Sequence, residues 1–243
     1  MTNQTEHHQA FPPTQWSVIL SASDDDSEIR SQALEHICQC YWHPIYAYAR
    51  KRGFSPQDAE DITQDFFGTL LETKGLEQAE AQRGKLRTYL LVRLRNFMAN
   101  EWRRRKTKKR GGGAAVLSLD LDEAEQRTCL EPADHLTPEA VFERHWATTL
   151  LNTVMQRLQE AFEADGKGEN FRVLKDYIAR GDHDRKYLEV SEQMGISENA
   201  VRLAIHRLRK RYRDLLLQEI ELTLEPGESA EAELRYLFGV FQS

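Results

Sequence analysis

The sequence predicts an all-α fold in which two small helical domains are joined by a flexible linker, the second domain containing a helix-turn-helix. Apolar residues recur at steps of three and four through most of the 243 residues, without a convincing alternating strand. The seven prolines fall mostly where helices would begin, and a glycine-rich, acidic stretch divides the helical pattern. We therefore expect an N-terminal extension at 1–26, domains at 27–108 and 137–220, a linker at 109–136 and a C-terminal extension at 221–243.

Three helices are predicted in the first domain. The first begins near Ser27, should kink or restart at Pro44 because proline lacks the amide donor, and ends before Gly53. The second begins after Ser55, a residue type that caps helix N-termini. The third runs from about residue 85 to 105.

The second domain begins with Thr137, which is placed to cap a long helix. Further helices are expected at about 170–180, 185–194 and 198–220. The C-terminal extension contains a short amphipathic pattern that predicts one more helix. Its apolar residues are Leu234, Leu237, Phe238 and Phe241.

The charged residues are unevenly distributed. A net charge of −6 argues at first against a nucleic-acid binder. However, residues 83–110 hold twelve basic residues and one acidic residue, and residues 201–213 hold six basic residues and no acidic one. These two segments together carry +17 and the rest of the chain carries −23. Such asymmetry is typical of interaction surfaces.

Several classes of protein are disfavoured. No apolar run approaches the roughly 20 residues that a spanning helix needs, and the N-terminus lacks the pattern of a secretory signal. The cysteines Cys38, Cys40 and Cys129 are too few and too irregular for a disulfide framework. We expect a cytoplasmic protein with buried or unreactive thiols, and neither membrane contact nor a metal or cofactor.

Residues 187–208 give the sharpest local signal, that of a helix-turn-helix. Ser191 supplies the small residue where two helices cross, and Gly195 tolerates a positive φ at the turn. Ile196 is expected to plug the core after the turn, and Ser197 to cap the second helix.

The second helix of this motif is expected to enter the major groove of DNA. Its inward residues are Val201, Ile205 and Leu208, and its outward residues are Glu198, Asn199, Arg202, Leu203, His206 and Arg209. The cations expected along phosphates are Arg207, Arg209, Lys210, Arg211 and Arg213. The alternative is an ordinary helical hairpin with a solvated basic face.

The basic segment 83–110 differs because aromatic and amide side chains interrupt its cations. Tyr89, Asn96, Asn100 and Trp102 would suit the unstacked bases of single-stranded DNA. The alternative is that the aromatic residues belong to the core. We assign Phe97 to the core and leave Trp102 open.

Residues 58–66 form an acidic, polar helix face beside Phe66 and Phe67. This face could dock a basic protein partner, although the residues alone favour an ordinary solvated surface.

The order and spacing of these features resemble the extracytoplasmic-function (group IV) RNA polymerase sigma factors. The resemblance is carried by residues 46–67, 83–105 and 187–213. A subgroup of that family has two further motifs, found here at Thr14–Leu20 and Lys109–Gly113. The sequence departs from the family in three ways: the usual Leu-Pro run before the helix-turn-helix is missing, Ser191 replaces the usual alanine, and the C-terminal extension is added.

The resemblance implies a role for each of three helices. Residues implied in binding core RNA polymerase are Asp58, Asp61, Gln64, Asp65 and Phe66. Residues implied in melting and reading the −10 element are Arg83, Lys85, Arg87, Tyr89, Arg93, Asn96, Asn100, Arg103 and Arg104. Residues implied in reading the −35 element are Ser197, Glu198, Asn199, Arg202, His206, Arg207, Arg209 and Lys210.

The expected function is therefore that of a sigma factor, which has core RNA polymerase and promoter DNA as partners and is not an enzyme. The resemblance leaves room for an anti-sigma or other regulatory protein as a further partner. One alternative is a stand-alone helix-turn-helix regulator of transcription. An enzyme built around His183, which lies between two aspartates, is disfavoured because adjacent loop residues point apart.

Overall fold

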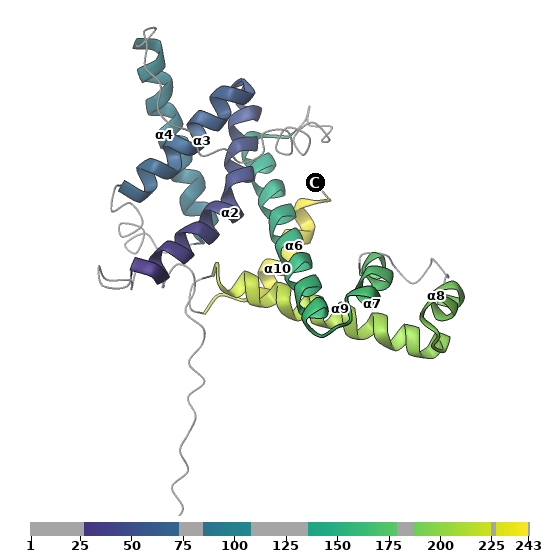
Figure 1. The fold of residues 1–243 in the computed structure, drawn as a ribbon. Helices are drawn as coiled ribbons and strands as arrows, with labels where there is room; N and C mark the ends of the chain where they lie inside the picture. The colour runs from purple at the N-terminus through teal and green to yellow at the C-terminus, as the bar shows by residue number, and fades with distance from the viewer. Residues whose placement is uncertain (1–26, 73–84, 108–135, 179–186, 225–226, 243) are drawn as a thin grey trace, which may run out of the picture. The chain divides into compact units, whose positions relative to one another are not determined.

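The structure, a computed structural model, describes residues 27–72, 85–107, 136–178, 187–224 and 227–242. All regular structure in these ranges is helical, which confirms the all-α prediction. The helices are α2 (Ser27–Lys51), α3 (Pro56–Glu72), α4 (Leu86–Thr107), α6 (Pro138–Ala164), α7 (Gly168–Leu174), η2 (Lys175–Tyr177), α8 (Tyr187–Met194), α9 (Glu198–Glu221) and α10 (Ala230–Val240) (Figure 1). They form two compact units, one built from α2 to α4 and the other from α6 to α10.

The first unit is held together by α3, which packs against both α2 and α4. Its largest fully buried side chains come from all three helices and follow the predicted helical spacing. They are Ile37, Tyr41, Ile45, Tyr46, Ile62, Leu86, Leu90 and Leu94. Such a core fixes which face of each helix remains at the surface.

Pro44 lies inside α2 without ending it, so the helix does not restart there, which was one of the two outcomes expected. Proline removes one amide donor from the helix. Tyr41 and Ile45, on either side of it, are fully buried. Their burial holds the helix together across the missing hydrogen bond.

The predicted helix ends are confirmed. Gly53 has a φ of 89°, the left-handed conformation that glycine adopts at low cost after a helix. The Asp58 amide donates to Ser55 Oγ at 3.1 Å, so Ser55 caps α3. In the second unit, the Ala140 amide donates to Thr137 Oγ1 at 3.2 Å and Thr137 caps α6.

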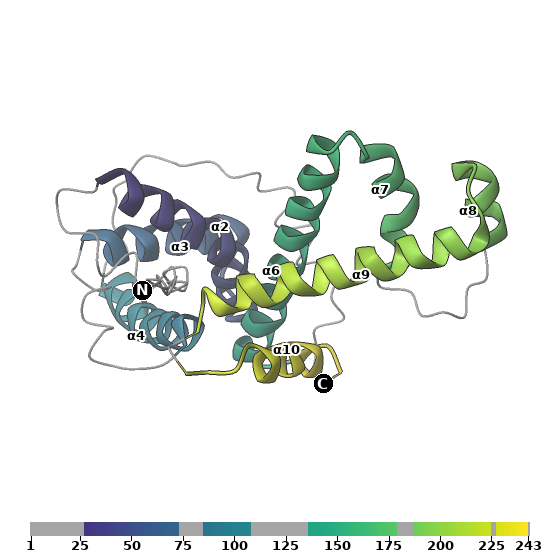
Figure 2. The same cartoon turned by 90° about the horizontal axis from the view of Figure 1, so that it is seen from below.

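The second unit has a core to which α6, α7, α8 and α9 all contribute. Its buried apolar residues are Leu158, Phe171, Leu174, Val190, Val201, Ile205 and Leu208. The helix predicted at 170–180 is instead α7 followed by the short 3-10 helix η2. Tightening of the last turn in this way is common at helix ends. Figure 2 shows α8 beside the N-terminal end of α9.

The predicted C-terminal helix is present as α10. It packs on α6 and buries Leu234 and Leu237. Phe238 and Phe241, which share its apolar pattern, are 52% and 37% exposed. The residues of α10 are thus part of the second unit, where their removal would uncover apolar surface.

No helix among the described ranges is both long enough and apolar enough to cross a lipid bilayer.

Candidate nucleic-acid and protein interfaces

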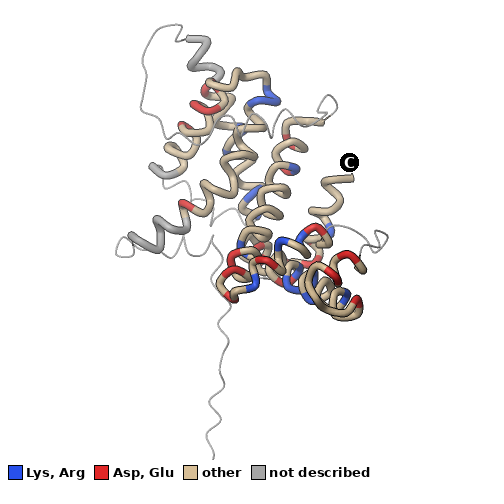
Figure 3. The backbone as a smooth tube through the Cα atoms, turned by 45° about the vertical axis from the view of Figure 1, so that its right-hand side comes forward, with Lys and Arg blue, Asp and Glu red and all other residues tan. Residues whose placement is uncertain are grey.

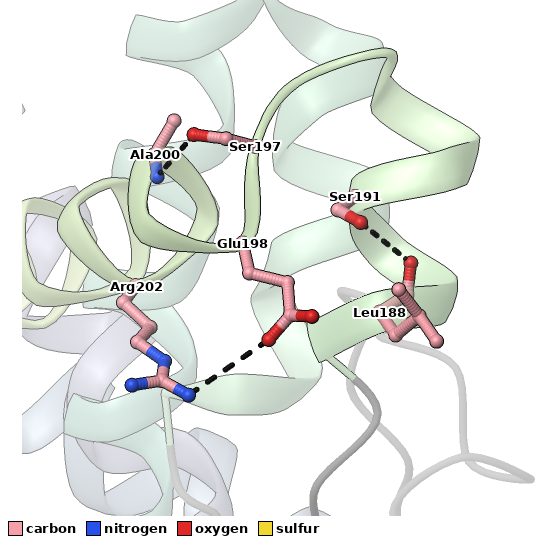
Figure 4. A network of polar contacts seen from close by, with 6 residues as sticks. All are labelled: Leu188, Ser191, Ser197, Glu198, Ala200 and Arg202. Atoms are coloured by element: carbon pink, nitrogen blue, oxygen red, sulfur yellow. Dashed lines mark hydrogen bonds and ion pairs between the residues drawn. The ribbon is translucent and has the colours of Figure 1, made fainter.

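The turn between α8 and α9 has the predicted local geometry. Gly195 has a φ of 65°, and the Ile196 amide donates to the Ser191 carbonyl at 3.1 Å. Ser191 is buried, and its Oγ donates to the Leu188 carbonyl at 2.7 Å. The Ala200 amide donates to Ser197 Oγ at 3.3 Å, so Ser197 caps α9 (Figure 4).

Ile196 does not plug the core as expected, because its side chain is 37% exposed. The partly buried Met194 packs against the core cluster from the other side of the turn. Met194, whose side chain is long and flexible, thus contributes to the core from the α8 side of the turn. Ile196 is left as apolar surface at the turn.

The inward face of α9 agrees with the prediction, and the outward face does so except at Arg209, which is half-buried. Val201, Ile205 and Leu208 are buried. The exposed residues of the first turns include Ser197, Glu198, Asn199, Arg202, Leu203 and His206. Asn199, Arg202, Leu203 and His206 are spaced by three or four residues and therefore share one face of the helix.

The five cations of α9 that were predicted to lie along phosphates divide into two groups. Figure 3 marks the positions of lysine and arginine along the backbone in blue. Arg209 is half-buried, and its Nε donates to the Tyr177 carbonyl at 2.9 Å. The Arg211 guanidinium lies 5.3 Å from the Phe162 ring centre and 3.8 Å from Asp165. These two arginines tie α9 to neighbouring parts of the second unit.

The other group consists of Arg207, Lys210 and Arg213. Within the described part of the chain, all three are exposed and make no hydrogen bond or ion pair. Their spacing of three residues places them along one side of α9. They are the cations of this helix that can approach a polyanion without breaking a contact inside the protein.

Arg202 is held by two weaker contacts. Its guanidinium lies 3.8 Å from Glu198 and 5.3 Å from the centre of the Tyr187 ring. A pocket of about 560 Å³ opens between α8 and α9, and these three residues line it together with His206.

In α4, the structure places several predicted −10 residues away from solvent. Arg87 is 5% exposed and Tyr89 is 7% exposed. Burial raises the pKa of Tyr89, with Arg93 acting in the opposite direction from 5.9 Å above its ring. Lys85 is half-buried. Arg83 and the side chains of Arg103 and Arg104 lie outside the described residues.

The exposed face of α4 is formed by other residues. Asn96 and Asn100 are exposed as expected, and they continue a row of four-residue steps that starts at Thr88 and Val92. Val92 is 46% exposed. The helical spacing of Thr88 and Val92 was readable in the sequence, but the predicted −10 residues were basic, aromatic and amide residues and included neither of them.

Phe97 is half-buried and packs against the core through Phe66. Its ring meets Phe66 edge-on at 5.7 Å between centres. Phe66 also meets Phe67 at 5.8 Å and is only 3% exposed. Phe66 therefore supports α3 from inside instead of offering its ring to a partner.

The acidic face of α3 is at the surface. Asp61 and Asp65 are exposed, whereas Asp58 and Gln64 are half-buried. The neighbouring Glu60 is buried, and burial followed by repulsion from Asp61 raises the pKa of Glu60. The surface that α3 offers to a partner is thus centred on Asp61 and Asp65.

The two described cysteines agree with the expectation of unreactive thiols. Cys38 and Cys40 are half-buried free thiols, and Cys40 Sγ lies 3.3 Å from His36 Nε2. Burial raises the pKa of Cys38, and raises that of Cys40 to about 12. A thiol with such a pKa is protonated at neutral pH and is a poor nucleophile.

The chain was compared with protein families, curated proteins and solved structures. No curated protein and no solved structure matched the chain. Residues 38–108 match the family model described as Sigma-70 region 2. The matched residues comprise most of α2 together with α3 and α4, the helices of the first unit. The first helical unit is therefore similar to Sigma-70 region 2.

Proposed function

We propose that the chain is an RNA polymerase sigma factor of the extracytoplasmic-function (group IV) class. It binds core polymerase, directs it to promoters through their −10 and −35 elements, and helps to open the DNA. The match of residues 38–108 to Sigma-70 region 2 is the observation that carries this proposal. The protein acts in the cytoplasm, catalyses no bond chemistry and needs no cofactor.

The first unit contributes polymerase binding and the −10 contacts. Asp61 and Asp65 project from α3 and give a basic partner an acidic surface. On α4, the exposed amides of Asn96 and Asn100 can donate to and accept from the edges of unstacked bases. Val92 adds an apolar contact on the same face.

The second unit contributes the −35 contacts through α9. Asn199, Arg202 and His206 face base edges in the major groove. Arg207, Lys210 and Arg213 contact phosphates, because no interaction among the described residues occupies them. Arg209 and Arg211 hold α9 in place, since both already contact other parts of the unit.

Charge substitutions on α3 test the division between polymerase binding and DNA binding. In Asp61→Asn with Asp65→Asn, we expect affinity for purified core polymerase to fall by about tenfold or more. Affinity for a duplex carrying the −35 element should stay unchanged. Glu35→Gln provides a control, because Glu35 is an exposed carboxylate on α2 of the same unit.

Three results would count against the proposal. Equal loss of core binding and duplex binding would contradict the role given to α3. Absence of co-elution between the wild-type chain and core polymerase would contradict the sigma-factor function itself. A tight, symmetric footprint by the protein alone would favour a stand-alone regulator.

A further inference from the structure

Tyr187, the first residue of α8, lies between an aromatic ring and an arginine. Its ring stacks on that of Tyr177, with 6.0 Å between centres and 28° between planes. The Arg202 guanidinium of α9 lies 5.3 Å from the centre of the Tyr187 ring. Tyr187 therefore joins α8, η2 and α9 at the pocket that opens beside the outward face of α9.

The surroundings of Tyr187 are fixed from two further directions. Arg209 donates from Nε to the Tyr177 carbonyl at 2.9 Å, which attaches η2 to α9. Glu198 lies 3.8 Å from one terminal nitrogen of Arg202, one helical turn away (Figure 4). The Arg202 side chain remains 60% exposed, so a ligand can reach it.

A guanidinium offers different interactions through its face and its edge. The face lies against an aromatic ring, whereas the N–H groups point outward in the guanidinium plane. Arginine recognises guanine through two of these edge donors, which reach O6 and N7. Arg202 can therefore contact the Tyr187 ring through its face and a base through its N–H edge at the same time. The carboxylate of Glu198 competes with the base for that N–H edge.

We propose that Tyr187 is a positioning residue that holds the Arg202 guanidinium with its donor edge directed at a guanine of the bound promoter. The inference rests on the proposed function, which makes Arg202 a reader of base edges. Holding a flexible arginine before binding reduces the conformational entropy lost on binding. Tyr187 therefore sets how strongly the protein distinguishes guanine from other bases at one position.

The test uses the full-length protein with core polymerase and a promoter duplex that this complex recovers from genomic DNA. Each guanine of the −35 element is replaced in turn by 7-deazaguanine, which lacks the N7 acceptor. At one guanine, the wild-type complex should lose roughly five- to a hundredfold in affinity. The affinity of the Arg202→Ala complex should not change when 7-deazaguanine replaces that same guanine.

The Tyr187 variants are then compared at that guanine. In Tyr187→Leu, the penalty for 7-deazaguanine should shrink by roughly two- to fivefold, whereas Tyr187→Phe, which keeps the ring, should retain it. Tyr187→Trp should equal or exceed the wild-type penalty, because tryptophan is the strongest partner for a cation. A purely structural role would weaken binding to both duplexes equally and leave the penalty unchanged.

The outcomes separate this inference from the function on which it rests. If no duplex is recovered with core polymerase, the proposed function fails and the inference with it. If a duplex is recovered but Tyr187→Leu retains the full penalty, the inference alone is overturned. A Tyr187→Trp penalty below that of the wild type would overturn it as well, without depending on the folding of the leucine variant.

Discussion

Three exposed cations on α9 should set the salt dependence of DNA binding by the second unit. We consider the replacement of Arg207, Lys210 and Arg213 by glutamine. Glutamine has nearly the same helix propensity as arginine and lysine. All three side chains are exposed and lack partners among the described residues, so the substitutions should change stability by less than about 0.5 kcal/mol.

The magnitude follows from the release of counterions. Each neutralised phosphate contributes about 0.9 to the slope of log K against log salt concentration, so three contacts contribute about 2.7. Between about 50 and about 200 mM salt, these contacts alone account for a roughly 40-fold loss of affinity. The triple variant should therefore bind more weakly at low salt and have a flatter slope.

The assay is fluorescence anisotropy of the full-length chain with a labelled duplex over that range of salt. Arg211→Gln is the matched control, because its guanidinium contacts Phe162 and Asp165 within the protein. This control should lower the unfolding midpoint and keep the wild-type slope. A triple variant with an unchanged slope, or an Arg211→Gln variant that loses as much slope, would refute the assignment of these cations.

Three further predictions concern the fold. Gly195→Ala should destabilise the protein by about 1–2 kcal/mol, because Gly195 has a positive φ. Gly68→Ala, inside α3, should stabilise it by up to about 1 kcal/mol. Urea unfolding measures both changes, and a loss of stability in Gly68→Ala would contradict the open space around Gly68. Thr137→Ala should cost about 1 kcal/mol by removing the cap of α6, and an unchanged urea midpoint would argue against that hydrogen bond. The pKa of Cys40 is raised to about 12 in the folded protein from its ordinary 9.0, so the unfolded chain loses the thiol proton first as pH rises. Stability should therefore fall as pH rises from about 9 towards 12. Cys40→Ala should show a smaller fall in stability, and an equal fall would contradict burial of the thiol.

Helix positions and caps were predictable because they depend on short stretches of sequence. Ser55 and Thr137 accept from amides within the next turn, and Gly53 and Gly195 occupy positive φ where a helix ends. Apolar spacing likewise predicted the inward face of α9. These features involve residues no more than one or two turns apart.

Orientation of polar residues was predicted less well, because residue type does not say which face a side chain occupies. Arg87 lies three residues before Leu90 and seven before Leu94, so its helical phase places it with the buried stripe. Phe66 was assigned to a partner although it continues the row of Ile62 and Leu70. Helical phase could have corrected both assignments.

Contacts between distant segments could not be predicted from a single sequence. Arg209 reaches the Tyr177 carbonyl across 32 residues, and Arg211 reaches Phe162 of α6. Only the packing of α9 on its neighbours determines which cations become engaged. For the same reason, the contact between Tyr187 and Arg202 was not predictable from the sequence.

Transcription in a purified system tests the central claim most directly. Core RNA polymerase and genomic DNA fragments are incubated with and without the protein, and the 5′ ends of the transcripts are sequenced. The sigma-factor function predicts discrete start sites that appear only with the protein and share two upstream elements. Start sites that are the same with and without the protein would contradict it.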